Sequence, residues 1–182
     1  MNIATPSIIV ITGIMASGKS TVAQALAERL PISVHLRGDI FRRMIVNGEA
    51  AITPLLSAEA TAQLRLRYQL AAQVAHSYCQ AGFTVIYQDI IIGPVLEEVL
   101  SWLGNAYPVY LVVLCPSPEI VAAREAGRDK TGYRDGWTPA LLNRDLRQAT
   151  PHLGLWLDTS ALSVEETVAA ILARLPAAAI AR

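Results

Sequence analysis

Four residues near the amino terminus have the types and the spacing that bind a polyphosphate. Gly13, Gly18, Lys19 and Ser20 satisfy the pattern G-x-x-x-x-G-K-[ST]. Glycines let the backbone curl so that N–H groups point at phosphate oxygens, and a helix that follows presents its positive amino terminus to the same anion. The lysine can reach the β- and γ-phosphates, and the serine hydroxyl can ligate Mg²⁺. We therefore expect a nucleoside triphosphate to contact Gly13, Ile14, Met15, Ala16, Ser17, Gly18, Lys19, Ser20 and Thr21.

A carboxylate with arginines one turn away follows the next expected strand. Asp39 begins a helix within RGDIFRR, residues 37–43, and Arg42 lies on the same helical face. A carboxylate beside a γ-phosphate can accept the proton of an attacking hydroxyl, and an arginine nearby can hold a polar or anionic acceptor. The alternative is that Asp39 only caps the helix and pairs with Arg43.

Two further groups are candidates for the same site. Asp89 ends the apolar run 83–89, where a carboxylate could ligate the metal or face the acceptor; it could also simply form a turn. Arg124 and Arg128 lie four residues apart where a helix enters a polar, glycine-rich loop. That placement suits a mobile lid, residues 124–137, whose arginines stabilise the transferring phosphoryl group, although arginine also favours helix carboxyl ends. Arg134 is a weaker candidate in the same loop.

Short apolar runs alternate with helical patterns along the chain, which indicates a parallel sheet covered by helices on both faces. Ligands of such sheets bind beyond the carboxyl ends of the strands, where the candidate residues fall. Ser57, Ser117, Thr138 and the Ser163–Glu166 capping box mark helix starts. We expect strands at 7–12, 33–37, 83–89, 107–115 and 154–160, and helices at 19–30, 39–45, 58–82, 94–103, 118–127, 138–149 and 163–175.

Composition limits the class of protein. The 182 residues are 53% hydrophobic and 16% charged, with a formal net charge of zero, which predicts one globular domain over residues 1–182. The neutral charge disfavours a polyanion such as nucleic acid as partner. Cys79 and Cys115 form no metal or disulfide pattern. The chain start lacks the features of a secretory signal and no apolar run is long enough to span a bilayer, so we expect a cytoplasmic protein without a membrane partner.

GIMASGKS, RGDIFRR, VIYQD and REAGR, in this order, resemble the small P-loop kinases of the chloramphenicol phosphotransferase-like and polynucleotide kinase-like (AAA_33-type) group. The resemblance spans nearly the whole chain. It implies a three-layer α/β fold with a five-stranded parallel sheet of order 2-3-1-4-5, a small helical lid, and ATP with Mg²⁺ as phosphoryl donor. By motif position, Asp39 resembles the general base, and Arg128 or Arg124 the lid arginine.

The chain departs from that group at one point. Gln88 and Asp89 stand where two carboxylates are often found, which puts a metal role of Asp89 in question. The segment expected to bind the acceptor, about 44–70, matches no pattern that we can identify. Within the long helix, Arg65 and Arg67 are expected to face solvent.

Three functions remain open. The leading hypothesis is an ATP-dependent phosphotransferase that acts on a hydroxyl of a small molecule, such as an antibiotic or a nucleoside. The second is a nucleotide or 5′-hydroxyl polynucleotide kinase, because polynucleotide kinases also carry Asp-x-x-Arg after the second strand. The third is a P-loop ATPase switch without an acceptor. The oligomeric state is not predicted. The first hypothesis rests on apolar and aromatic residues in the expected acceptor region, which suit a compact, partly apolar molecule: Phe41, Met44, Ile45, Leu55, Leu56 and Tyr68. The alternative, which is the commoner place for such side chains, is the core.

Overall fold

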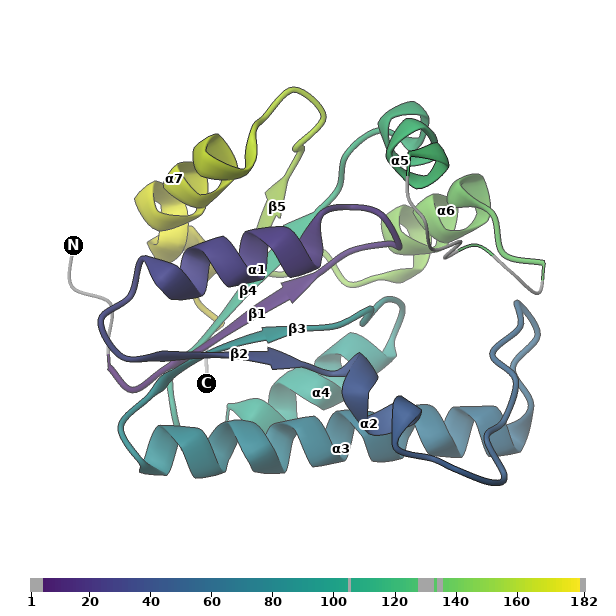
Figure 1. Ribbon diagram of the computed structural model, residues 1–182, viewed down its shortest axis with the longest axis horizontal. Coiled ribbons are helices and arrows are strands. Elements are labelled where there is room, and N and C mark those ends of the chain that lie inside the picture. Colours follow the sequence, from purple (N-terminus) through teal and green to yellow (C-terminus); the bar gives the residue numbers. More distant parts are fainter. Residues whose placement is uncertain (1–4, 105, 128–132, 134–135, 181–182) are drawn as a thin grey trace.

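The strands form one sheet in the middle of the molecule. The structure, a computed structural model, describes residues 5–104, 106–127, 133 and 136–180. Within these residues, five parallel strands lie in the order β2-β3-β1-β4-β5, as the family resemblance implied (Figure 1). The strands are β1 (Ile8–Thr12), β2 (Ser33–Arg37), β3 (Thr84–Gln88), β4 (Val109–Leu114) and β5 (Leu155–Leu157).

Helices cover both faces of the sheet and complete three layers. On one face lie α1 (Lys19–Glu28) and α7 (Val164–Arg174), and on the other lie α3 (Ala58–Gln80) and α4 (Val95–Leu103) (Figure 1). The chain turns through α2 (Asp39–Arg43) after β2 and through α5 (Pro118–Ala126) after β4. It continues through α6 (Pro139–Ala149) before β5, and a short 3₁₀ helix, η1 (Leu175–Ala178), follows α7.

The sheet divides the core into two apolar clusters. The cluster beneath α3 and α4 contains Tyr87 and Leu103, and the cluster beneath α1 and α7 contains Leu26 and Ile171. Strand β1 is buried along its whole length because β3 and β4 pair with its two edges and its side chains enter the apolar clusters on both faces of the sheet. Its run of β-branched residues suits a strand buried on both faces. The central strand therefore holds the loop that follows it in a fixed position.

Side-chain caps begin most of the longer helices where the sequence predicts them. Ser57, Ser117 and Thr138 each accept a hydrogen bond from a backbone N–H in the first turn of α3, α5 and α6. Ser163 and Glu166 form the expected capping box at α7. These bonds satisfy amide groups that have no partner within the helix.

Two expectations need correction. The last strand has three residues rather than the seven of 154–160, because Asp158 and Ser160 form a turn in which the carboxylate accepts from the Ser160 backbone N–H at 2.9 Å. Arg67 does not face solvent: it is 8% exposed and pairs with Asp89. Among the described residues, no helix is long and apolar enough to cross a membrane.

Candidate active site

The phosphate-binding pattern forms a tight loop between β1 and α1. A Cβ atom at Gly13 would lie 2.4 Å from the carbonyl oxygen of Leu114, and the residue has a φ of 144°, so only glycine fits there. The N–H of Ser17 donates to the Ile14 carbonyl at 3.2 Å, which closes the turn. The loop delivers the chain to the first residue of α1, whose amino terminus favours an anion.

Lys19 and Ser20, the first two residues of α1, line one pocket. The Lys19 ammonium is buried and donates to the Ile14 carbonyl at 2.7 Å. The Ser20 hydroxyl lies 3.4 Å from Oε1 of Gln88, at the end of β3. Both residues line a pocket of about 530 Å³, together with Asp39, Gln88 and other residues of the carboxyl edge of the sheet. The pocket is therefore lined by the ammonium group of Lys19 and by side chains with oxygen atoms from α1, α2 and β3.

Asp39 begins α2 and faces the same pocket. Its Oδ2 accepts a hydrogen bond from Arg43, four residues on, and its Oδ1 lies 3.7 Å from Nε of Arg37. Oδ1 is buried and accepts no hydrogen bond among the described residues. One carboxylate oxygen is thus held by an arginine, while the other has no hydrogen-bond donor among the described residues. The predicted pairing with Arg43 and a role in proton transfer are compatible.

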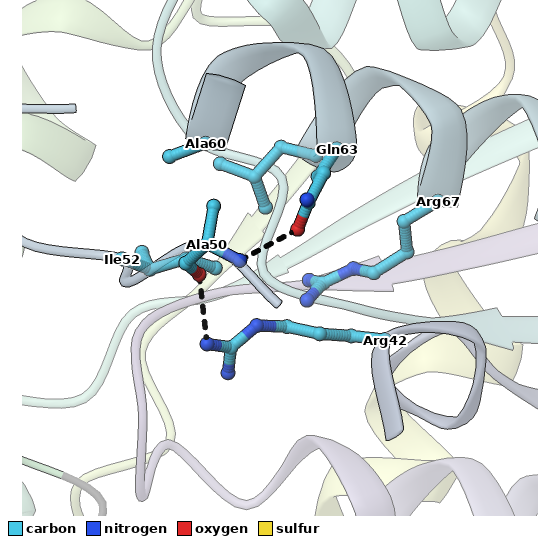
Figure 2. Close-up of a pocket in the computed structure, with 7 residues that line it drawn as sticks. Arg42, Ala50, Ile52, Ala60, Gln63 and Arg67 are labelled. Carbon is cyan, nitrogen blue, oxygen red and sulfur yellow. Dashed lines mark hydrogen bonds between the residues drawn. The ribbon is translucent and has the colours of Figure 1, made fainter. Parts of the chain in front are cut away.

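Arg42 contacts the segment that follows α2. Its guanidinium lies 2.9 Å from Glu49 and donates to the Ala50 carbonyl at 3.3 Å. Figure 2 shows Arg42 and Arg67 entering one small cavity of about 10 Å³ from α2 and α3. Arg42 therefore contacts the predicted acceptor region, and its side chain also holds that region in place.

Asp89 is fully buried beside the phosphate pocket and is held by Arg67. Nε of Arg67 donates to Oδ2 of Asp89 at 3.0 Å, and Nη2 donates to Oδ1. The Ile90 N–H and the Tyr87 hydroxyl also donate to this carboxylate, at 2.7 and 3.2 Å. Burial alone would lower the pKa of Arg67, but Asp89 raises it and the net shift is upward, so the arginine keeps its charge.

Arg67 is the functional candidate that our reading of the sequence missed. The buried residues of α3 include Ala60, Arg67, Tyr68 and Ala71, which recur at helical spacing. This spacing puts the arginine within the apolar stripe of the helix, where a charge is found only with a partner. The stripe was readable from the sequence, but the partner 22 residues away was not.

The predicted lid is described in part. Arg124 donates to the Thr159 carbonyl at 3.0 Å and to the Ser17 carbonyl at 3.4 Å, so it touches the phosphate loop. Arg128 and Arg134 lie outside the described residues. Tyr133 donates its hydroxyl to the Met15 carbonyl at 2.8 Å. Contacts from the segment after β4 thus reach the loop that would hold the triphosphate.

The metal-binding potential of the pocket lies in oxygen atoms. Among the described residues, no group of three or more His, Cys, Asp or Glu side chains could hold a metal ion. The Ser20 hydroxyl, the Gln88 amide oxygen and the Asp39 carboxylate nevertheless line one pocket. Mg²⁺ prefers oxygen ligands and is usually bound by few protein groups together with phosphates and waters. The residues present fit Mg²⁺ bound together with a nucleotide.

The sheet order and the loop at its central strand define a P-loop kinase fold, and comparisons with known proteins agree. A family model described as an AAA domain, AAA_33, matches residues 8–150. The chain therefore belongs to this AAA domain family. No curated protein sequence matches the chain.

Solved structures show the same fold. A sugar kinase from Janibacter sp. HTCC2649 has a TM-score of 0.68 and 19% identity, over 95% of this chain and 96% of that one. The tunicamycin resistance protein of Deinococcus radiodurans has a TM-score of 0.66 and 17% identity, over 97% of this chain and 99% of that one. The Mycobacterium tuberculosis APS kinase CysC, in complex with AMPPNP and APS, has a TM-score of 0.65 and 17% identity, over 94% and 98%.

Proposed function

We propose that this protein is an ATP-dependent phosphotransferase, which moves the γ-phosphoryl group of ATP to a hydroxyl of a small molecule such as an antibiotic or a nucleoside. The observation that carries the proposal is the presence of Asp39, Lys19 and Ser20 around one pocket at the carboxyl edge of the sheet. A cation for the phosphates, a hydroxyl for the metal and a carboxylate for the proton are the parts that phosphoryl transfer to an alcohol requires.

The roles follow from the chemistry of each group. The amides of residues 13–20 and the Lys19 ammonium bind the β- and γ-phosphates, and Ser20 holds Mg²⁺. When bound, Mg²⁺ neutralises charge on the phosphate oxygens. The acceptor oxygen forms a bond to the γ-phosphorus, the bond from that phosphorus to the β–γ bridging oxygen breaks, and ADP leaves. The proton of the acceptor hydroxyl passes to the carboxylate of Asp39, which lines the pocket.

Arginines have three separate roles in this proposal. Arg124, which already touches the Ser17 carbonyl, or Arg128 stabilises the charge of the transferring group. Arg42 orders the acceptor segment, or contacts the acceptor directly. Asp89 positions Arg67, which lines the phosphate pocket. A direct contact of Asp89 with the metal would require its oxygens to give up hydrogen bonds that they now accept from Arg67 and the Ile90 N–H.

Names of the structural neighbours support a small acceptor. They include a sugar kinase, a tunicamycin resistance protein and an APS kinase bound to AMPPNP. The Asp-x-x-Arg pattern at residues 39–42 keeps a 5′-hydroxyl polynucleotide or a nucleotide as the second candidate acceptor. A P-loop switch that hydrolyses ATP without an acceptor is the third.

One screen separates these functions. The protein is incubated with ATP and Mg²⁺ and with antibiotics, nucleosides, nucleotides, sugars or 5′-hydroxyl oligonucleotides, and products are identified by mass spectrometry. We expect the mass of a small alcohol to rise by about 80 Da, because a phosphoryl group replaces the hydrogen of its hydroxyl group. For a good acceptor, we expect about 1 to 100 transfers per second. Phosphorylated oligonucleotides would favour the second candidate. Release of phosphate to water alone, with every acceptor unchanged, would contradict the proposal.

A further inference from the structure

A second cavity lies directly beside the phosphate pocket. Its volume is about 420 Å³, within the range of sites that bind small molecules. The two cavities share the side chains of Met15, Arg67 and Ile90 as a common wall. A molecule in the second cavity would therefore lie beside the pocket that Lys19 and Ser20 line.

The walls of this cavity are mostly apolar. They come from the segment after α2, from α3, from the residues after β3, and from the region of α6. The Tyr68 hydroxyl already donates to the Ile90 carbonyl at 2.8 Å, so the ring presents mainly its apolar body. A ligand that fills the space gains stability by removing apolar surface from water. The side chains that carry this argument are Ile52, Leu64, Tyr68, Ile92, Trp137 and Leu142.

The arginines around the cavity carry no uncompensated charge. Arg42, Arg65 and Arg67 line it, and no Asp or Glu does so among the described residues. Each arginine nevertheless pairs with an acid outside the wall. Arg42 lies 2.9 Å from Glu49, Arg65 pairs with Glu98 across α3 and α4, and Arg67 pairs with Asp89.

This pairing decides which acceptors fit. An anion that leaves water for an apolar space needs a cation that is not already neutralised. An arginine that is held by its own carboxylate offers little net attraction to a second one. An uncharged ligand loses less hydration on entry and gains from the apolar walls.

Polar contacts hold the wall in shape before any ligand arrives. Gln63 of α3 accepts from the Ala50 N–H at 2.9 Å (Figure 2). It also donates to the Gly48 carbonyl at 2.7 Å. Arg42 binds the Ala50 carbonyl from the other side. Trp137 donates from Nε1 to the Ile52 carbonyl at 3.0 Å. A wall that is ordered in advance costs less to organise when the ligand binds.

We propose that the acceptor is an uncharged molecule whose ring or branched hydrocarbon body fills this cavity and whose hydroxyl faces Asp39. This inference rests on the proposed transferase function. It narrows the acceptors to uncharged, largely apolar alcohols, and it excludes sugar acids, nucleotides and 5′-hydroxyl oligonucleotides as the preferred class.

Matched probes test the charge rule by binding rather than by turnover. Benzyl alcohol, naphthalenemethanol and biphenylmethanol are each compared with the same alcohol carrying a ring carboxylate. Binding to the full chain with AMPPNP and Mg²⁺ is measured by ligand-observed NMR. We expect the best uncharged alcohol to bind at least about tenfold more tightly than its carboxylate. Equal or tighter binding of the carboxylates, or binding of no probe, overturns the proposed acceptor class.

Two lysine variants on α3 locate the binding. Leu64→Lys adds a charge to the cavity wall and is expected to weaken binding of the uncharged alcohol about tenfold or more. Leu66→Lys adds the same charge on the same helix, but at a side chain that is 50% exposed and does not line the cavity, so binding stays within about twofold. Circular dichroism verifies that both variants fold. An equal effect of the two variants overturns the cavity as the binding place.

Glu98→Gln gives a gain of binding. The variant removes the acid that neutralises Arg65 and leaves the cavity with one unpaired cation. We expect the carboxylate probes to bind severalfold more tightly than to the wild type, and an unchanged affinity counts against the charge rule. The two proposals fail separately: transfer only to charged acceptors overturns this inference alone. Binding of the uncharged alcohols without transfer to any acceptor overturns the transferase function.

Discussion

A Cβ atom built onto Gly38 would lie 2.0 Å from Oδ2 of Asp89. The backbone at Gly38 has a φ of −65°, which any residue adopts, so the requirement for glycine is one of space. The same carboxylate is held in place by Arg67 from α3. The turn that carries Asp39 therefore lies directly on a buried ion pair, and the candidate base is positioned by Asp89, which follows β3, and by Arg67 of α3.

Gly38→Ala should disturb Asp39 through this contact. The added methyl group displaces either the turn or the buried carboxylate, at a cost of about 1–3 kcal/mol in the free energy of unfolding. A shift of about 1 Å at the reacting groups lowers phosphoryl transfer about 100-fold. Steady-state kinetics with ATP and an acceptor, together with an ATP-binding titration, measures both effects. ATP binding should change little.

Gly127→Ala is the matched control for stability. Its Cβ would meet no atom closer than 3.8 Å, and its φ is −87°. Its free energy of unfolding should lie within about 0.5 kcal/mol of the wild type. A Gly38→Ala protein that transfers at the wild-type rate would show that Asp39 does not depend on the contact with Asp89.

The Arg67–Asp89 pair should behave as one unit in unfolding. The two side chains are 10% and 2% exposed, so Arg67→Met leaves a buried carboxylate without its partner, and Asp89→Leu leaves a buried guanidinium. Each change should lower the free energy of unfolding in urea by about 3–5 kcal/mol. The double variant should lose less than the sum, because it leaves neither charge unpaired. Losses that simply add would mean that the two residues are not coupled.

His35 should make the fold less stable in mild acid. Burial, and then the nearby charge of Arg37, lower the pKa of His35 below its usual 6.5. As pH falls, His35 therefore becomes protonated in the unfolded chain before it does so in the folded protein. The stability that the neutral imidazole contributes is fully present above about pH 6.5, and it is lost as pH falls through the lower pKa of the folded protein. Melting temperatures at about pH 7.5 and 5.5 measure this loss.

His35→Gln removes the titrating group and serves as the comparison. The wild type should lose more melting temperature between the two pH values than His35→Gln does. The same loss in both proteins would assign the acid sensitivity to other residues. The side chain at this position also contacts Gln24, at 2.9 Å from Nδ1, so the difference between pH values is compared and not the absolute melting temperature.

The sequence was sufficient for the features that local chemistry determines. The spacing of Gly13, Gly18, Lys19 and Ser20 predicted the loop because each residue acts on the same few atoms. The caps at Ser57 and at other helix starts were predictable for the same reason: donor and acceptor lie within one turn. The sheet order came from the family resemblance and not from these local patterns.

Contacts between distant segments were not predictable in this way. The pairing of Arg67 with Asp89 joins a helix to the end of a strand, and no local pattern identifies the partner. Residues 44–57, the part of the predicted acceptor segment 44–70 that precedes α3, have no regular secondary structure. They are held by Arg42 of α2, Gln63 of α3 and Trp137, which lies just before α6. Periodicity therefore carries no information on the cavity that this segment lines.

In the proposed reaction, Lys19 binds ATP and Asp39 accepts the proton. An ATP-binding titration and a phosphoryl-transfer assay on the same variants test this separation most directly. Lys19→Ala should lose both ATP binding and transfer, since the cation contacts the phosphates. Asp39→Asn should bind ATP within about twofold of the wild type while phosphoryl transfer falls about 10²- to 10⁴-fold, because the amide cannot accept the proton. Transfer by Asp39→Asn at the wild-type rate would contradict the central claim.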